Sequence, residues 1–165
     1  MRHSRDINDP AMTRTTPAAK TKSLPVPNRS LTTLYVVTAI LSLLGLADAI
    51  YLTIEHITGQ SVRCTIIAGC SEVLSSQYAV MFGVPLAALG AAAYFGVFSL
   101  ATLAAFGYRV AGLLLTILVS VMFLMSLWLI YLQAFVIKAF CQFCLFSAAI
   151  TVLMTVLVFL IRRQR

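Results

Sequence analysis

The side chains in this sequence that are best able to do chemistry are its four cysteines, which form two spaced pairs. Cys141 and Cys144 make a Cys-x-x-Cys, and five residues separate Cys64 from Cys70. Two neighbouring thiols can be oxidised to a disulfide, and a thiolate can open a disulfide through a mixed-disulfide intermediate. The two pairs therefore predict a thiol–disulfide relay.

The Cys-x-x-Cys is expected to open an apolar helix that runs to the end of the chain. Backbone N–H groups and the dipole at a helix N-terminus stabilise a thiolate, which lowers the pKa of the leading cysteine, Cys141. Residues three apart share one helix face, so Cys144 is expected one turn deeper beside Cys141. Such a pair can open by thiolate attack and present its inner sulfur toward the lipid.

Two other uses of four cysteines are weighed beside the relay. Two structural disulfides would staple a loop on the oxidising side of a membrane, and four thiolates could bind zinc. A structural zinc site usually has two short-spaced pairs, and Cys64 and Cys70 are too far apart for that pattern. The sequence therefore predicts no metal site and favours the relay over stapling.

Four apolar runs have to position these cysteines. Hydrophobic residues make up 61% of the 165-residue chain and charged residues only 10%, whereas soluble domains average about 25% charged residues. A spanning helix needs roughly 20 apolar residues, and four runs reach that length. The sequence predicts an all-α integral membrane protein, a four-helix bundle. Its expected spans are residues 31–54, 80–106, 110–132 and 141–161.

The basic residues set the expected orientation of the bundle. Ten of the twelve lie before the first run, between the second and third, or after the fourth, and only Arg63 and Lys138 lie in the other two loops. Positive charge is enriched in cytoplasmic loops, so both termini are expected in the cytoplasm and all four cysteines on the extracytoplasmic side. The net charge of +7 thus follows from topology, and no nucleic-acid partner is predicted.

The chain divides into three parts on this basis. Residues 1–30 are polar and proline-containing, which predicts a disordered cytoplasmic tail; residues 31–161 form the membrane domain, and 162–165 a basic cytoplasmic end. Cleavage of a signal peptide near Ala49 is the alternative, disfavoured because the polar segment before the apolar run is too long.

Small residues from Ala87 to Gly96 allow another helix to approach closely, which predicts that the second span is central in the bundle. Trp128 and Tyr131 lie near the outer end of the third span and predict an interfacial aromatic belt.

Three motifs together resemble the vitamin K epoxide reductase family, particularly its bacterial members. The motifs are the Cys-x5-Cys loop pair, the segment Cys70-Ser-Glu-Val-Leu-Ser-Ser76 leading to Phe82-Gly-Val-Pro85, and the Cys-x-x-Cys opening the last helix. The end of the first span, Gly45 to Leu52, is also similar to the family. The resemblance covers about residues 31–161 and implies a bundle around a quinone in a bacterial inner membrane, with the loop folded over its outer mouth.

The resemblance also implies roles for particular residues. Cys64 would exchange with a redox partner, Cys70 with Cys141, and Cys144 would face the quinone ring. Ser76 matches a serine that the family places at the quinone carbonyl, although a serine there is also typical of a helix cap or loop hydroxyl. For Asp48, a side chain at headgroup level and a functional acid inside the membrane are equally weighted alternatives.

Two departures from the vertebrate pattern bear on the substrate. Ala148 lies where vertebrate members have a tyrosine, and Ala79 lies near their substrate-binding asparagine, which favours a respiratory quinone of the ubiquinone or menaquinone type over vitamin K epoxide. Many bacterial relatives are fused to a thioredoxin-like domain. This chain stops at Arg165, so a separate DsbA-like thioredoxin-fold partner is expected.

The expected function is therefore a quinone-dependent thiol oxidase that re-forms the disulfide of its DsbA-like partner. A DsbB-like quinone reductase is the alternative enzyme, disfavoured because that family has its Cys-x-x-Cys in the first outer loop and its wider pair in the second. A non-enzymatic membrane scaffold with two structural disulfides is the alternative from another class. The sequence does not indicate an oligomeric state.

Overall fold

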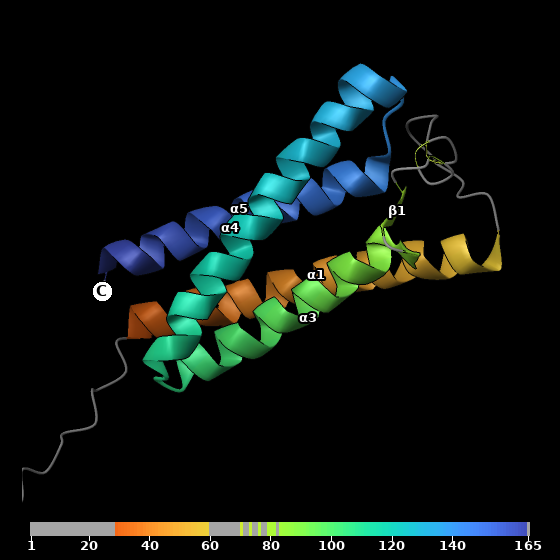
Figure 1. Ribbon diagram of the computed structural model, residues 1–165. Coiled ribbons are helices and arrows are strands. Elements are labelled where there is room, and N and C mark those ends of the chain that lie inside the picture. Colours follow the sequence, from red (N-terminus) through yellow and green to blue (C-terminus); the bar gives the residue numbers. More distant parts are fainter. Residues whose placement is uncertain are drawn as a thin grey trace, which may run out of the picture.

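Four long helices dominate the described part of the computed structural model, which comprises residues 29–59, 70, 73, 76, 79–81 and 83–164 (Figure 1). They are α1 (Arg29–Thr58), α3 (Leu86–Ala105), α4 (Arg109–Tyr131) and α5 (Gln142–Gln164), and a π-helical segment, η2 (Leu132–Ile137), continues α4. Each is long and apolar enough to cross a membrane, α4 together with η2. The predicted all-α membrane bundle is confirmed. Most of the predicted tail, residues 1–28, lies outside the described residues.

The helices pack as a ring in which α1 and α4 each contact both α3 and α5. The interface between α1 and α3 is the most extensive, and Figure 1 shows these two helices side by side. This close packing agrees with the small residues of the second span, but the prediction that this span is central was wrong, because in the ring α3 contacts only α1 and α4 extensively. Val97, Ala101 and Met154 are among the side chains buried in the core of the ring. Large apolar side chains cover the outer faces, as a multi-pass membrane protein requires.

A close contact between α1 and α3 joins Gly45 to the ring of Tyr94. Tyr94 is only 2% exposed, and its hydroxyl hydrogen-bonds the hydroxyl of Ser147 on α5 at 2.7 Å. A Cβ atom at Gly45 would overlap the aromatic ring. The missing side chain of Gly45 therefore lets Tyr94 reach across the bundle and join three helices.

We expect Gly45→Ala to lower the free energy of unfolding by about 1–3 kcal/mol, the usual cost of overpacking a core. The Tyr94 ring cannot move aside without losing its bond to Ser147. Gly90→Ala is the matched control, because a methyl group there would meet only the Ala49 side chain at 4.0 Å. Thermal unfolding in detergent, followed by circular dichroism, measures both variants. Equal stability of the two variants would contradict this account of the Gly45 contact.

The second helix begins at Leu86, so its predicted start at residue 80 was wrong. Residues Val80–Met81 (β1) instead pair antiparallel with Val84–Pro85 (β2). Gly83 makes the turn between them with a φ of 80°, a conformation that glycine adopts readily. Pro85 lies immediately before the helix. Hydropathy cannot separate this short apolar ribbon from the helix that follows.

The third span is longer than predicted because η2 carries it on to Ile137. Lys138 then adopts a left-handed conformation, with φ 55°, and turns the chain back toward the bundle. Cys141 precedes α5 directly, and its carbonyl oxygen accepts a hydrogen bond from the Leu145 N–H at 3.0 Å. Cys141 therefore occupies the N-cap of α5, close to its predicted place at the helix start.

Three aromatic rings follow one another on the outside of α4 and η2, at the end of the bundle that carries Cys141. Trp128 and Tyr131 have ring centroids 5.9 Å apart, and those of Tyr131 and Phe135 are 5.1 Å apart. All three side chains are at least half exposed. Exposed aromatic rings near a helix end are typical of an interfacial belt, which was the prediction for Trp128 and Tyr131.

Candidate functional site

Three of the four cysteines meet at one end of the bundle. Cys70 is 1% exposed and Cys141 fully buried, and both belong to one apolar cluster with Leu52 of α1. Cys144 packs against the same cluster. The fold thus brings a cysteine from the first loop to the Cys-x-x-Cys, although 71 positions separate Cys70 from Cys141 in the numbering. Cys64 lies outside the described residues.

The described cysteines are in two oxidation states. Cys70 is disulfide-bonded, whereas Cys141 and Cys144 are free thiols. The Cys144 thiol donates a hydrogen bond to the Cys141 sulfur.

The hydrogen bond from the Cys144 thiol lowers the pKa of Cys141 from 9.0 to about 7. Burial opposes this change, and the backbone N–H groups of Cys144 and Phe143, at the start of α5, add to it. The negative charge of Asp48 acts in the opposite direction. Cys141 is therefore the better nucleophile of the pair near neutral pH, in agreement with the predicted effect of a helix N-terminus.

We expect the thiolate absorbance of the reduced Cys-x-x-Cys to rise with increasing pH, with a midpoint of about pH 7. The sign follows from the lowered pKa of Cys141, since the thiolate fraction exceeds one half only above that pH. In Cys144→Ala the midpoint should move toward the ordinary cysteine value of about 8.5, because the largest cause of the shift is gone. A wild-type midpoint as high as that of Cys144→Ala would contradict the proposed hydrogen bond.

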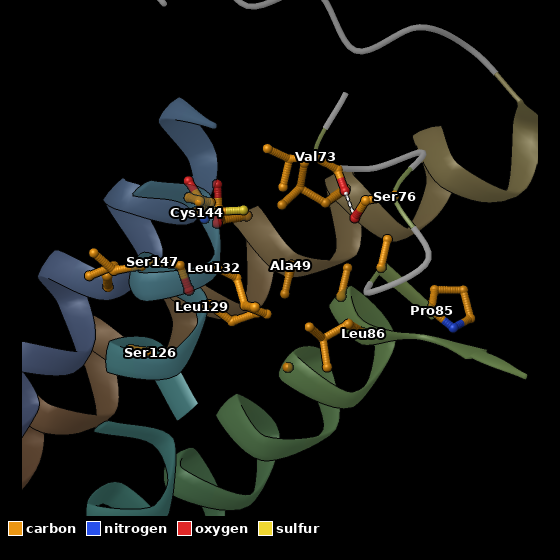
Figure 2. A pocket seen from close by; sticks show the side chains of 18 of the residues that line it. Ala49, Val73, Ser76, Pro85, Leu86, Ser126, Leu129, Leu132, Cys144 and Ser147 are labelled. Carbon is orange, nitrogen blue, oxygen red and sulfur yellow. Dashed lines mark hydrogen bonds between the residues drawn. The ribbon is translucent and has the colours of Figure 1, made fainter. Parts of the chain in front are cut away.

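Beside Cys144 the bundle encloses a cavity of about 150 Å³. Side chains of α1, α3, α4, η2 and α5 line it, most of them apolar, together with residues 73, 76 and 79. Figure 2 shows the Cys144 sulfur directed from α5 toward this space. An apolar cavity of about 150 Å³ in another protein accommodates benzene. The cavity at Cys144 is therefore large enough for one six-membered ring.

Asp48 supplies the one acidic group in the described wall of this cavity. Its Oδ2 atom is buried and has no hydrogen-bond partner. A buried polar oxygen without a hydrogen-bond partner is energetically unfavourable, so a ligand that donates a hydrogen bond to Oδ2 would be stabilised there. Asp48 thus lies in the cavity wall, whereas its depth in the membrane and its role stay predictions.

Ser76 lines the cavity from the loop, but its hydroxyl proton is already engaged. The Ser76 Oγ donates to the Val73 carbonyl oxygen at 2.7 Å, a bond drawn in Figure 2. The loop-hydroxyl alternative therefore describes this conformation, and a bond to a ligand would need rotation about the Cα–Cβ bond. Ala79 and Ala148, the two positions that depart from the vertebrate pattern, also line the cavity.

Gln133 is a site residue that the sequence reasoning missed. It lies in η2, is 2% exposed, lines the cavity and accepts a hydrogen bond from the Cys141 backbone N–H at 3.0 Å. The available signal was a lone amide directly after the predicted third span, because polar side chains at membrane depth are often functional. Nothing in the spacing of Gln133 from Cys141 indicated the contact, which depends on the turn at Lys138.

A metal centre finds no support in the described residues. No group of three or more His, Cys, Asp or Glu side chains among them could hold a metal ion. Cys70 is in addition disulfide-bonded and so is not a thiolate ligand in this state.

Comparison with known proteins identifies two similarities. Residues 36–159 match the model of the vitamin K epoxide reductase family. The thiol-disulfide oxidoreductase LTO1 of Arabidopsis thaliana is 48% identical over 48 residues, which are 28% of this chain and 13% of the plant protein. The family match covers most of the membrane bundle, whereas the plant protein is much longer than the matched segment.

Proposed function

The chain belongs to the vitamin K epoxide reductase family, and from that premise we propose that it is a quinone-dependent oxidase of a DsbA-like, thioredoxin-fold protein. As a member of this family it is a membrane thiol oxidoreductase. One observation carries the finer proposal: Cys70 and Cys141 share a buried cluster, and Cys144 beside them faces a cavity that admits one ring.

The proposed relay begins at the loop pair. A thiolate of the reduced partner attacks Cys64 of a Cys64–Cys70 disulfide, forming a mixed disulfide and releasing Cys70 as a thiolate. Cys70 then attacks Cys141 of a Cys141–Cys144 disulfide, and Cys144 leaves with the electron pair. Cys64, freed by the partner's second thiol, attacks Cys70 and releases Cys141. The products are an oxidised partner, a loop disulfide and a reduced Cys-x-x-Cys.

The cavity supports a quinone as the electron acceptor. A bound quinone supplies a sink for two electrons and two protons, which is what the Cys141/Cys144 dithiol loses when it returns to the disulfide. The lining fits a flat ring with polar edges, because it is mostly apolar and carries the unpartnered Asp48 Oδ2 and the Ser76 hydroxyl. The small side chains of Ala79 and Ala148 favour a ubiquinone or menaquinone type.

Asp48 is the acidic group in the cavity wall, and we give it the proton-handling role in this scheme. It shares the cavity with Cys144 and is close enough to act electrostatically on that sulfur. We assign to its carboxylate the proton that leaves the Cys144 thiol, which Asp48 then passes on into the cavity. A carboxylate without a competing hydrogen bond at Oδ2 is free to accept that proton.

The structural-scaffold alternative is less well supported than the relay. A stapling role requires no cavity beside the second cysteine pair, whereas Cys144 lines one. Redox-state mapping by thiol alkylation in cells separates the two: a relay shows mixed states that shift when quinone is depleted, and structural bridges do not. The DsbB-like alternative remains disfavoured by the order of the two pairs along the chain.

Purified protein in lipid, supplied with a quinone and a reduced DsbA-like protein, provides the direct test. Oxidation of the partner should proceed only with quinone present, and quinone loss should match disulfide formation one to one. Partner oxidation that does not depend on quinone would overturn the proposal for the acceptor. Quinone loss without partner oxidation would overturn the proposal for the donor.

We place the protein in a bacterial inner membrane with both termini cytoplasmic and the cysteines outside. The support is the distribution of basic residues, ten on one side and two on the other. A reporter enzyme that works only in the periplasm, fused after Arg165, should be inactive. The same reporter inserted after Gly59, at the end of α1, should be active, and the reverse pattern would invert the assigned topology.

A further inference from the structure

Gln133 offers both ends of one amide group to the Cys-x-x-Cys. Its Oε1 accepts the Cys141 backbone N–H at 3.0 Å, and its side chain also hydrogen-bonds the Cys144 sulfur. A backbone N–H can only donate, so the amide oxygen must face Cys141 and the NH₂ group is left to donate to Cys144. One buried side chain thus contacts both reactive residues.

The local backbone explains how Gln133 reaches this position. It belongs to η2, the π-helical end of the third span. Such π-helical turns are rare in proteins overall, and those that occur are often at functional sites. The left-handed Lys138 then reverses the chain, which returns Cys141 to the side chain of a residue eight positions earlier. The Gln133 side chain is 2% exposed, so water does not compete for its hydrogen bonds.

The surroundings of Cys144 change during the proposed relay. In the dithiol state the Cys144 thiol donates to the Cys141 sulfur. When Cys70 attacks Cys141, the Cys70–Cys141 bond forms, the Cys141–Cys144 bond breaks, and the electron pair leaves on Cys144. The new thiolate lies in a mostly apolar cavity, where an unpaired charge is costly. At that moment Cys144 needs a donor.

We propose that Gln133 is a catalytic hydrogen-bond donor that holds the Cys144 sulfur at the cavity and stabilises it as the departing thiolate. The contact to the neutral thiol already exists, and a hydrogen bond to an ionised sulfur is roughly twice as strong as one to a neutral group. Gln133 therefore stabilises the products of the Cys70 attack more than the reactants. This inference rests on the proposed relay and adds to it the group that makes Cys144 a good leaving group.

The alternative is that Gln133 only caps the start of α5. Two variants separate these roles. Gln133→Met removes both hydrogen bonds at similar volume, whereas Gln133→Glu keeps an acceptor for the Cys141 N–H and replaces the amide donor by a carboxylate. Phe135→Leu is the matched control, because Phe135 lies in the same π-helical segment but is 68% exposed on its outer side.

The first measurement needs neither quinone nor partner. In a Cys141→Ala background with the loop pair kept oxidised, Cys144 is the remaining free thiol, and its ultraviolet thiolate absorbance can be read at fixed alkaline pH. Adding Gln133→Met or Gln133→Glu should lower the thiolate fraction about tenfold, as expected for loss of a hydrogen bond to a charged group. Phe135→Leu should leave it unchanged. A fraction within twofold of the control for both variants would overturn the proposal.

The second measurement follows electron transfer from the loop pair to the Cys-x-x-Cys after mixing with reduced partner, by acid quench, alkylation and mass mapping. Both variants should slow the appearance of the Cys141/Cys144 dithiol about tenfold. If Gln133→Met does not fold, Gln133→Glu carries the test, and a wild-type rate in it would identify Gln133 as a cap. Normal transfer in the wild type without quinone reduction would instead contradict the proposed function and leave this inference standing.

Discussion

Cys144→Ser is expected to abolish quinone reduction, with a loss on the order of 10³-fold or more, as removal of a reacting nucleophile commonly causes. Cys144 is the cysteine that lines the cavity, whereas Cys141 is fully buried in the cluster that contains Cys70. A serine at 144 keeps the volume and a hydrogen-bond donor but cannot exchange with a disulfide. Quinone absorbance in lipid-reconstituted protein measures the effect.

The same variant should accumulate a cross-link between Cys70 and Cys141. Without Cys144, the Cys141 sulfur has no neighbour in the Cys-x-x-Cys with which to form a disulfide, and Cys70 lies in its cluster. Non-reducing digestion and mass mapping identify the linked peptides. Cys141→Ser is the comparison: it should also stop transfer from the loop, but without the cross-link, and it leaves the Cys144 sulfur able to contact quinone. Near wild-type quinone reduction in Cys144→Ser would refute the central step.

Asp48→Asn should slow quinone reduction by about 10²-fold while leaving the protein at least as stable as the wild type. General acid–base groups typically contribute 10²–10⁴-fold, and an amide of the same shape cannot take the Cys144 proton. The Asp48 Oδ2 is buried without a partner, so removing its charge relieves an unfavourable burial. Stopped-flow quinone absorbance and thermal unfolding measure the two effects separately.

Two further variants distinguish proton transfer at Asp48 from mere packing. Asp48→Glu retains a carboxyl group and should recover part of the rate that Asp48→Asn loses. Glu55→Gln, on the same helix but outside the cavity wall, should behave as wild type in both measurements. If Asp48→Asn reduces quinone at the wild-type rate, the protons travel by another route and Asp48 is only part of the lining.

The four spans can be predicted from the sequence because length and apolarity alone decide whether a helix can cross a membrane. The residues at which the spans begin and end are predicted less accurately. Residues 80–85 are as apolar as a helix but form a ribbon around Gly83, and η2 prolongs the third span with a different hydrogen-bond register. Hydropathy reports which solvent a segment prefers, and it carries no information on backbone hydrogen-bond register.

Sequence reasoning identified those candidate site residues whose type and spacing alone indicate their chemistry. Cysteines at a helix start predict a low-pKa thiol, and Cys141 has one because of its hydrogen bond and its place before α5. Ser76 was placed at the cavity, but the sequence could not show that its proton is donated to Val73. Gln133 and the orientation of Asp48 depend on how helices turn and pack. Both become visible only in three dimensions.

Trp128 gives the protein a built-in optical probe of its cavity. It is the only tryptophan in the chain, and its neighbours Leu129 and Ile130 line the cavity wall. Its ring stacks on Tyr131 and is 54% exposed on the outside of α4. Quinones quench indole fluorescence at short range, so ligand titrations can be followed in unlabelled wild-type protein. Brominated lipids of graded depth would report through the same ring how deeply this end of the bundle lies in the bilayer.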